Sequence, residues 1–432
     1  MVRVGRYPLH HGTVGAIRSL GRLGVDVHAI VEDRLTPAAV SRHLNGRWVW
    51  PTDGDEDPAV LVEGLSAIAR RVRERTGRAP LAIPTDDEAA VLLAERADAF
   101  AGLLTLPPVA PGLPRALSSK SGLAALCREH GVDTPGSLAP RSWGELDAVL
   151  TGAAGLRFPL VAKNDVPYSR LSRPAVGATT LLPDADALRA LAAGWRAGPA
   201  GPRAGADALP HVLLQEYLPR QEAEDWIAHL YCPGDRSAEG VVFTGVKVRS
   251  WPAGAGVTAH AYSVANPELA ELSRRFCAAI GFRGIADLDW RLDRRDGRHK
   301  LLDFNPRVGA QFRLFETYAG VDVVRALHLD LSGRPIPPAD PVEGRRFTVE
   351  ILDGPARLAA RRGHSSAQLP AAAPAPAVDV PPARLRELAW AAADDPLPAL
   401  AATVRSAGPV AHRARALARR AGRALLRRRD GA

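Results

Sequence analysis

Acidic and amide side chains alternate with apolar ones in the region of Asp287, Asp289, Asp303 and Asn305. A turn dipeptide, Asp296-Gly297, separates the first two residues from the last two. Because side chains alternate between faces along a strand, this pattern predicts a β-hairpin with one apolar and one acidic face. A loop with an odd number of residues centred on Asp296 would place Asp289 opposite Asp303 and Asp287 opposite Asn305. On the apolar face we expect Leu302 beside Phe304.

Opposed carboxylates repel one another unless a cation lies between them. Carboxylate and amide oxygens suit Mg²⁺, which commonly shares its coordination shell with substrate phosphates. We therefore interpret Asp289, Asp303 and Asn305 as a magnesium site. The alternative is a solvated acidic strand face that neighbouring arginines neutralise.

Lysine is rare in this chain. Among 56 basic side chains, only Lys120, Lys163, Lys247 and Lys300 are lysines. The lysines are therefore candidates for positions that need a compact ammonium group rather than a planar guanidinium. Lys163 ends an apolar run, so its charge needs a partner. Lys247 precedes Arg249 by two residues on an expected strand, where both cations would share one face and bind one anion.

The segment Asp303-Phe304-Asn305-Pro306-Arg307, with Asp289 before it, resembles the closing motif of the ATP-grasp superfamily, in particular its carboxylate–amine ligases. The family motif has Glu where this chain has Asp303. The resemblance implies ATP as the nucleotide and two Mg²⁺ ions at Asp289, Asp303 and Asn305.

The resemblance also implies a role for other residues along the chain. Lys120 and Lys163 correspond to the lysines that reach the ATP phosphates. The segment Gln215, Glu216, Tyr217 and Leu218 resembles the hinge that reads adenine, and either Glu224 or Asp225 corresponds to the ribose-binding acid. A solvated charge cluster at 222–225 is the alternative. Lys247, Arg249 and Arg307 are the implied catalytic cations. The expected phosphate lid at 164–180 lacks the glycine-rich sequence of the family.

The predicted fold class is α/β and α+β. Residues 1–110 are similar to the Rossmann-like domain that precedes the ATP-grasp fold, and residues 111–335 to its two lobes, at about 120–210 and 211–335. In the first domain we expect a turn at His10–Gly15 and a helix at Ala16–Leu23. Capping of a helix suffices to explain the acids of Thr85-Asp86-Asp87-Glu88. Residues 336–432 are expected to form an extension with a Pro/Ala linker and an Arg-rich helix.

Composition excludes several classes of protein. The 432 residues are 46% hydrophobic and 24% charged, which is ordinary for a globular chain. The net charge of +9 is concentrated after residue 403, so we expect no nucleic-acid binding by the folded body. The basic tail could contact an anionic surface or remain a solvated helix. Three separated cysteines and the lack of a long apolar run predict a cytoplasmic protein with reduced thiols.

These observations predict an ATP-dependent ligase that joins a carboxylate to an amine through an acyl phosphate. The expected substrates are small molecules, amino acids in the first place, with specificity in His10–Gly15, Gln311 and Arg313. One alternative is a non-catalytic ATP-binding module docked by its basic tail. Another is carboxylation chemistry with bicarbonate as the activated acid, although the chain has no carrier-domain region.

Overall fold

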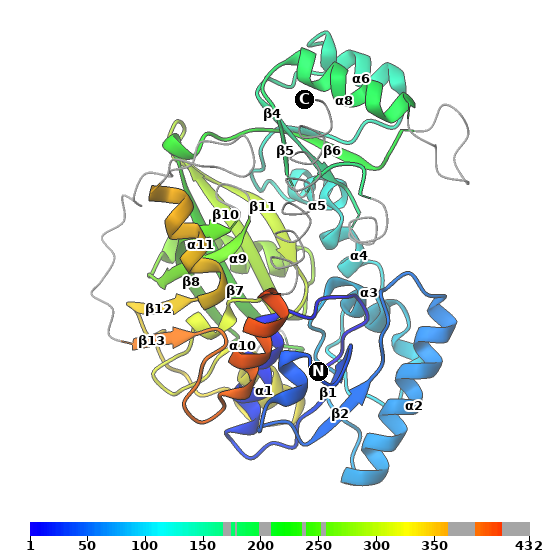
Figure 1. Ribbon diagram of the computed structural model, residues 1–432, viewed down its shortest axis with the longest axis vertical. Helices are drawn as coiled ribbons and strands as arrows, with labels where there is room; N and C mark the ends of the chain where they lie inside the picture. Colours follow the sequence, from blue (N-terminus) through cyan, green and yellow to red (C-terminus); the bar gives the residue numbers. More distant parts are fainter. Residues whose placement is uncertain are drawn as a thin grey trace, which may run out of the picture.

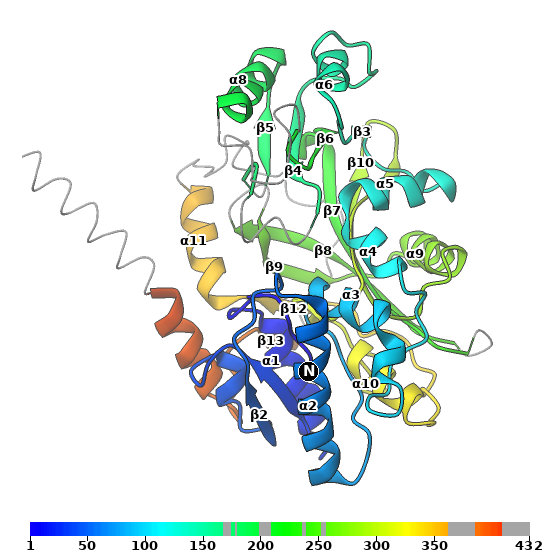
Figure 2. The same ribbon diagram turned by 90° about the vertical axis from the view of Figure 1, so that its right-hand side faces the viewer.

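The structure is a computed structural model that describes residues 1–166, 174–177, 179–197, 209–235, 239–251, 256–361 and 385–407. The basic tail beyond residue 407 and part of the expected phosphate lid lie outside these ranges. Figures 1 and 2 show three packed units, and the described residues 345–361 and 385–407 lie against the first and the third.

The first unit contains a parallel sheet with helices around it. Strands β1 (His28–Val31) and β2 (Gly46–Val49) pair in parallel, and bridges from Val2 to Pro84 and from Leu81 to Thr105 extend the arrangement. Parallel pairing with helices around it is consistent with the Rossmann-like domain that the sequence predicts, and that assignment stays a prediction. The helical segments are α1 (His11–Gly21), η1 (Pro37–Val40), α2 (Pro58–Thr76), α3 (Asp87–Glu95) and η2 (Ala97–Phe100).

Helix α1 begins at His11, so the expected turn at His10–Gly15 is wrong. Gly12 and Gly15 serve close packing instead of a turn. A Cβ atom on Gly12 would lie 2.6 Å from the carbonyl oxygen of Gly309, and one on Gly15 would lie 2.7 Å from Arg313 Cγ. The small residues therefore allow the N-terminus of α1 to approach the segment that follows Asn305.

The second unit is a small antiparallel sheet in the order β3-β6-β4-β5. Its strands are β3 (Ser137–Leu138), β4 (Leu160–Asn164), β5 (Thr180–Leu182) and β6 (Val212–Glu216). Helices α6 (Trp143–Leu150) and α8 (Ala185–Ala197) cover it, and α4 (Leu113–Ser118) and α5 (Lys120–Glu129) connect it to the first unit (Figure 1). Ser119 caps α5, as predicted, by accepting a hydrogen bond from the Gly122 N–H.

The third unit is a seven-stranded sheet in the order β11-β10-β7-β8-β9-β12-β13. Its central strands are β7 (Ala223–Cys232), β8 (Val241–Trp251), β9 (Val257–Ser263), β10 (Gly284–Asp293) and β11 (Arg298–Asn305), and η3 (Arg220–Glu222) precedes them. Helix α9 (Pro267–Ala279) packs on one face with a core that includes Phe276, Trp290 and Phe304. Helices α1 and α10 (Val323–Leu331), together with η4 (Phe312–Leu314), bury the other face.

The hairpin β10–β11 has the predicted pairing but not the predicted loop. Asp289 lies opposite Asp303 and Asp287 opposite Asn305. The strands part between Asp293 and Arg298, so the loop is even, and a β-bulge beside Asp289 restores the pairing. The bulge makes Leu302 the extra residue. Leu302 therefore lines a cavity while Leu301 and Phe304 enter the core, which corrects the expected pairing of Leu302 with Phe304 on one face.

The residues after 335 return to the large sheet. Strands β12 (Arg345–Thr348) and β13 (Leu385–Leu388) form its far edge, and α11 (Glu350–Arg361) contacts β8 and β9. The buried ion pair Arg18–Asp395, at 2.9 Å, then joins α1 to the following segment. The extension expected from residue 336 is thus integrated into the fold over its described part, and the domain boundaries themselves stay predictions.

Candidate active site

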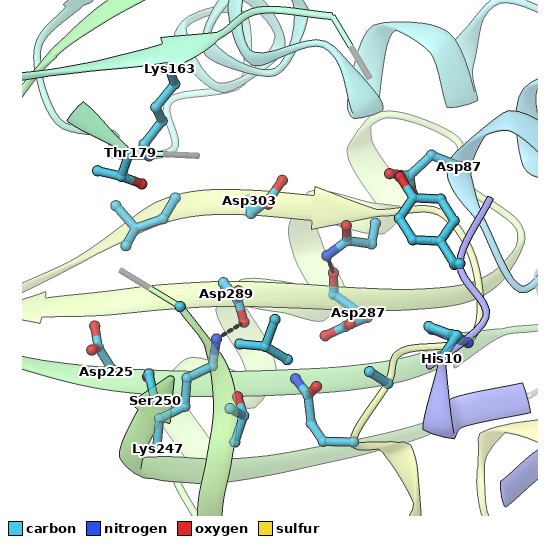
Figure 3. Close-up of a pocket in the computed structure, with 18 of the residues that line it drawn as sticks. His10, Asp87, Lys163, Thr179, Asp225, Lys247, Ser250, Asp287, Asp289 and Asp303 are labelled. Carbon is cyan, nitrogen blue, oxygen red and sulfur yellow. Dashed lines mark hydrogen bonds and ion pairs between the residues drawn. The ribbon is translucent and has the colours of Figure 1, made fainter. Parts of the chain in front are cut away.

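A cavity of about 960 Å³ lies where the three units meet. Its lining includes β4 and β6 of the small sheet, β7, β8, β10 and β11 of the large sheet, and the loop before α1. One end, which we call the lysine end, contains Lys120, Lys163 and Lys247. The other, the histidine end, contains His10, His11, Asp87, Asp287 and Arg307. Figure 3 shows both ends along the hairpin.

The lysine end contains the opposed carboxylates. Asp289 and Asp303 face each other across β10 and β11, and each forms an ion pair with a lysine. Lys247 Nζ lies 2.5 Å from Asp289 Oδ1, and Lys120 binds Asp303. Burial raises the pKa of Asp289, and the neighbouring Asp287 and Asp303 add to the effect against the attraction of Lys247. Positive charge near Asp289 and Asp303 is therefore needed to stabilise their ionised forms.

The donor set fits Mg²⁺ because two carboxylates and the Asn305 amide oxygen supply only oxygen ligands. Lysine ammonium groups contact both carboxylates, so cations already neutralise these positions. Among the described residues, no three Asp, Glu, His or Cys side chains form a metal cluster. The site would thus hold its ions through two carboxylates, one amide and the substrate phosphates. The metal assignment and the count of two ions stay predictions.

Arg307 is fixed from three directions. Its guanidinium lies 3.3 Å from Asp87 Oδ1 and 3.4 Å from Asp287 Oδ2, and it donates to Asn305 Oδ1 at 2.9 Å. Burial alone would lower the pKa of Arg307, but Asp87 and Asp287 raise it. Asp87 belongs to α3 of the first unit, so this arginine joins the first unit to the large sheet. Capping is therefore not the whole role of the acids at 86–88: Asp86 caps α3, and Asp87 binds Arg307.

Lys163 lies at the cavity end of the buried strand β4. Its ammonium group donates to Gln215 Oε1 at 2.9 Å, so a neutral amide is the partner in this contact. Burial first, and then the nearby Lys120, lower the pKa of Lys163 to about 8 against the attraction of Asp303. A phosphate beside this lysine would restore the missing negative charge.

The segment at the end of β6 lines the cavity with Glu216, Tyr217 and Leu218. The Glu216 side chain accepts the Arg157 backbone N–H at 3.0 Å, and the backbone N–H groups of Glu216 and Tyr217 donate to Gly136 and Pro159. The structure also separates the two candidate ribose acids. Asp225 lines the cavity beside Arg291, whereas Glu224 lies on the opposite strand face and binds Arg294 at 2.9 Å.

The expectation that Lys247 and Arg249 share a strand face is wrong. The pairing of β8 with β9 shifts on both sides of Arg249, so Lys247 and Ser250 line the cavity instead. Arg249 points to α11 and binds Asp353 at 2.7 Å. A double bulge is invisible in the sequence, where simple alternation predicts a common face.

Gln311 lines the cavity, as the predicted specificity role requires, but Arg313 does not. Arg313 is buried and binds Asp322 at 2.7 Å and Glu387 at 3.4 Å. It therefore ties the segment after β11 to α10 and β13, which is a structural role.

Asp87, Leu302 and Trp390 line the cavity, although the sequence assigned none of them a role there. His10 and His11 also line it, and they belong to the segment His10–Gly15 in which the sequence predicted specificity. His229 lies fully buried behind the cavity, with Nε2 2.8 Å from Asp287 Oδ1. Asp287 was recognisable as part of the acidic strand face, but its partner on β7 was not. Burial alone would raise the pKa of Asp287, yet His229 and Arg307 hold it below its usual value.

Comparisons with known proteins agree with this geometry. D-aspartate ligase from Enterococcus faecium (strain Aus0004) is 21% identical over 306 residues, which cover 69% of this chain and 68% of the relative. N5-carboxyaminoimidazole synthetase from Staphylococcus aureus, solved with ADP, superposes with a TM-score of 0.57 at 9% identity, covering 81% of this chain and 84% of that chain. This chain has the ATP-grasp fold.

A second solved structure supports the same conclusion. The biotin carboxylase domain of 2-oxoglutarate carboxylase from Hydrogenobacter thermophilus, in complex with MgADP and bicarbonate, has a TM-score of 0.54 at 14% identity, covering 78% of this chain and 71% of that chain. No protein-family profile matches the chain. The predicted ATP-grasp resemblance and fold class are confirmed, and the relatives support an ATP-dependent enzyme of the ligase type.

Two further expectations concern the surroundings of the protein. No helix in the described ranges has the length and apolar character that a membrane span requires. Cys127, Cys232 and Cys277 are free thiols. The cytoplasmic location stays a prediction, as does any contact of the basic tail with an anionic surface.

Proposed function

We propose that this protein is an ATP-dependent ligase that activates a carboxylate as an acyl phosphate and transfers the acyl group to an amine. The products are an amide or peptide bond, ADP and phosphate. The observation that carries the proposal is the lysine end of the cavity, where opposed Asp289 and Asp303 lie among Lys120, Lys163 and Lys247.

ATP binding follows from the shape and charge of the lysine end. Glu216, Tyr217 and Leu218 line the cavity and would contact the adenine, and Asp225, which also lines it, would bind the ribose hydroxyls. Lys120 and Lys163 would bind the phosphates as ammonium groups. Mg²⁺ held by Asp289, Asp303 and Asn305 would neutralise charge on the phosphate oxygens.

Phosphoryl transfer needs cations around the substrate carboxylate and the moving phosphoryl group. Lys247 lines the cavity beside Asp289, and Arg307 lines it at the histidine end. Arg307 would bind and orient the substrate carboxylate, and Lys247 would stabilise the transferred phosphoryl. Arg249, which binds Asp353 outside this lining, would act at most by positioning β8.

The carboxylate substrate is expected to be an amino acid, and D-aspartate is the first to test because the curated relative is a D-aspartate ligase. Bicarbonate belongs in the same panel because one neighbouring structure contains it. The test is a screen for ADP release with each acid, in the presence and absence of an amino-acid mixture as acceptor.

The control is Asn305→Ala, which removes the amide ligand. We expect acid-dependent ADP release from the wild type and its loss in this variant. Release from Asn305→Ala at the wild-type rate would contradict the assigned metal site. ATP binding without ADP release under any condition would instead indicate a non-catalytic ATP-binding module.

A further inference from the structure

A row of exposed aliphatic side chains follows the last helix that the structure describes, at residues 397–407. Leu397, Leu400 and Val404 are 53%, 62% and 66% exposed, respectively. Their spacing of three and four residues places them on one face of the helix. Single exposed aliphatic residues are ordinary on a protein surface, but a contiguous row of them marks a place where the molecule meets an apolar partner.

The opposite face of this helix is anchored to the first unit. Ala402 is fully buried in the core that also contains residues of α1. The buried ion pair Arg18–Asp395 holds the segment just before the helix, and Arg405 binds Asp33 near its end. These contacts fix the rotation of the helix, so the aliphatic row faces outward because of how the helix is docked.

The exposed apolar surface continues onto the segment after β1. One carboxylate oxygen of Asp33 accepts the Leu35 N–H at 2.8 Å, and the other binds Arg405. Leu35 therefore lies close to the helix at 397–407, and its side chain is 74% exposed. The neighbouring Arg34 is exposed as well and adds a positive charge. We call this surface the aliphatic face and define it by Leu35, Leu397, Leu400 and Val404.

The charges next to the aliphatic face favour an anionic partner. An arginine pairs with each of three neighbouring aspartates: Arg405 with Asp33, Arg22 with Asp394, and Arg18 with Asp395. An anionic surface would therefore meet no unpaired carboxylate from these aspartates. The 25 residues after 407 contain eight arginines and a single acidic residue, Asp430. The chain that continues from the helix thus carries a strong positive charge.

Aliphatic side chains and a high positive charge in one place favour the surface of an anionic membrane. Aliphatic side chains enter the boundary between the headgroups and the acyl chains, while arginines bind the anionic headgroups. A nucleic acid offers phosphates but no apolar region that would cover the exposed aliphatic residues. A second copy of the chain would bring the same positive charge to the contact and would be repelled.

We propose that the aliphatic face is a docking site for an anionic membrane. Leu397, Leu400 and Val404 enter the boundary between headgroups and acyl chains, and the arginines after residue 407 bind the headgroups. Apolar insertion and charge attraction act together, since neither alone gives stable binding at a membrane surface. The proposal does not depend on the ligase function, because no residue of the aliphatic face lines the cavity.

The test is sedimentation of the full chain with lipid vesicles. One set of vesicles is phosphatidylcholine alone, and in the other about one third of the lipid is phosphatidylglycerol, whose headgroup is anionic. We expect the chain to bind the anionic vesicles at least about tenfold more strongly than the neutral ones. Binding to the anionic vesicles should weaken as the salt concentration is raised, because salt screens the attraction of the arginines.

Leu400→Asp should weaken binding to the anionic vesicles by about tenfold, because it removes an inserting side chain and adds a negative charge. Val404→Asp should weaken it by a similar factor. The matched control is Val60→Asp, which changes a valine that is 55% exposed on α2. Figure 1 shows α2 well apart from the helix at 397–407, so this variant should bind as the wild type does. Urea denaturation should show that all three variants stay folded, because the changed positions are exposed.

Three outcomes would overturn the assignment of the aliphatic face. Equal binding to both sets of vesicles, or binding to neither, would show that the chain does not recognise an anionic membrane. Binding that Leu400→Asp and Val404→Asp leave unchanged would show that the arginines make the contact alone. Self-association that these two variants abolish, measured by analytical ultracentrifugation without lipid, would show that a second copy covers the face.

Discussion

The two ends of the cavity are built in different ways. The lysine end depends largely on one hairpin, in which Asp289 and Asp303 are fixed by direct backbone pairing. The histidine end combines His10, Asp87 and Arg307 from segments that are far apart in the sequence. A local motif therefore fixes the first end, whereas the second exists only after the units have docked. Substitutions at the two ends should accordingly differ in what they damage.

The largest effect is expected from Asp303→Asn, which should lower carboxylate-dependent ADP release by about 10³-fold because it removes a charge aimed at the phosphates. Its fold should remain intact by circular dichroism. The matched control is Asp296→Asn in the same hairpin, where the side chain is 42% exposed and binds Lys300. If both variants lost activity equally, hairpin distortion rather than ion binding would be the cause. Asp303→Glu, which introduces the usual family residue, should retain activity within about tenfold.

The second prediction concerns the docking that forms the histidine end. Asp395→Ala should lower the free energy of unfolding by about 3 kcal/mol, because it leaves the buried Arg18 with backbone acceptors but without its carboxylate partner. Urea denaturation followed by tryptophan fluorescence measures the change. The adjacent Asp394→Ala removes a half-exposed partner of Arg22 and His43 and should cost less than about 1 kcal/mol. Equal losses would mean that burial does not decide the strength of this contact.

The third prediction uses the pKa of Lys163 at the lysine end. This lysine is charged below pH 8 and loses its charge as the pH rises through about 8. ATP affinity should therefore weaken by up to about tenfold for each pH unit above that value, until bound phosphate restores the charge. Isothermal titration of ATP between pH 7 and 9.5 measures this dependence. Lys163→Met should bind ATP weakly with a flatter pH profile. If ATP affinity in Lys163→Met depended on pH as it does in the wild type, the group that titrates would not be Lys163.

The smallest effect is expected from the pair of neighbouring acids on β7. Asp225→Asn should raise the KM for ATP by about tenfold through the loss of a charged hydrogen-bond acceptor. Glu224→Gln should leave the KM within about twofold, since Glu224 faces Arg294 and Trp226 away from the cavity. Steady-state kinetics with ATP varied compares the two. A larger rise in the KM for ATP in Glu224→Gln than in Asp225→Asn would place the ribose on the other face of β7.

The sequence predicted the parts of the site that depend on alternation and local signals. The acidic face of β10 and β11, the cap at Ser119 and the buried approach to Lys163 all depend on residues close to one another in the chain. It failed where an irregularity changes the alternation. The bulge at Leu302 changed which leucine enters the core, and the double shift around Arg249 moved that side chain out of the cavity.

The sequence by itself determined the ATP-grasp fold and the oxygen-rich hairpin, because strand periodicity and a short motif specify both. Only the tertiary structure decided which of Glu224 and Asp225 faces the cavity, because only strand pairing fixes the face. It also decided that Asp87 holds Arg307, and that α1 brings His10 to the site through the close contact of Gly12 with Gly309. These relations join residues separated by up to about 300 positions. Packing between the units creates these contacts, and no local sequence pattern predicts them.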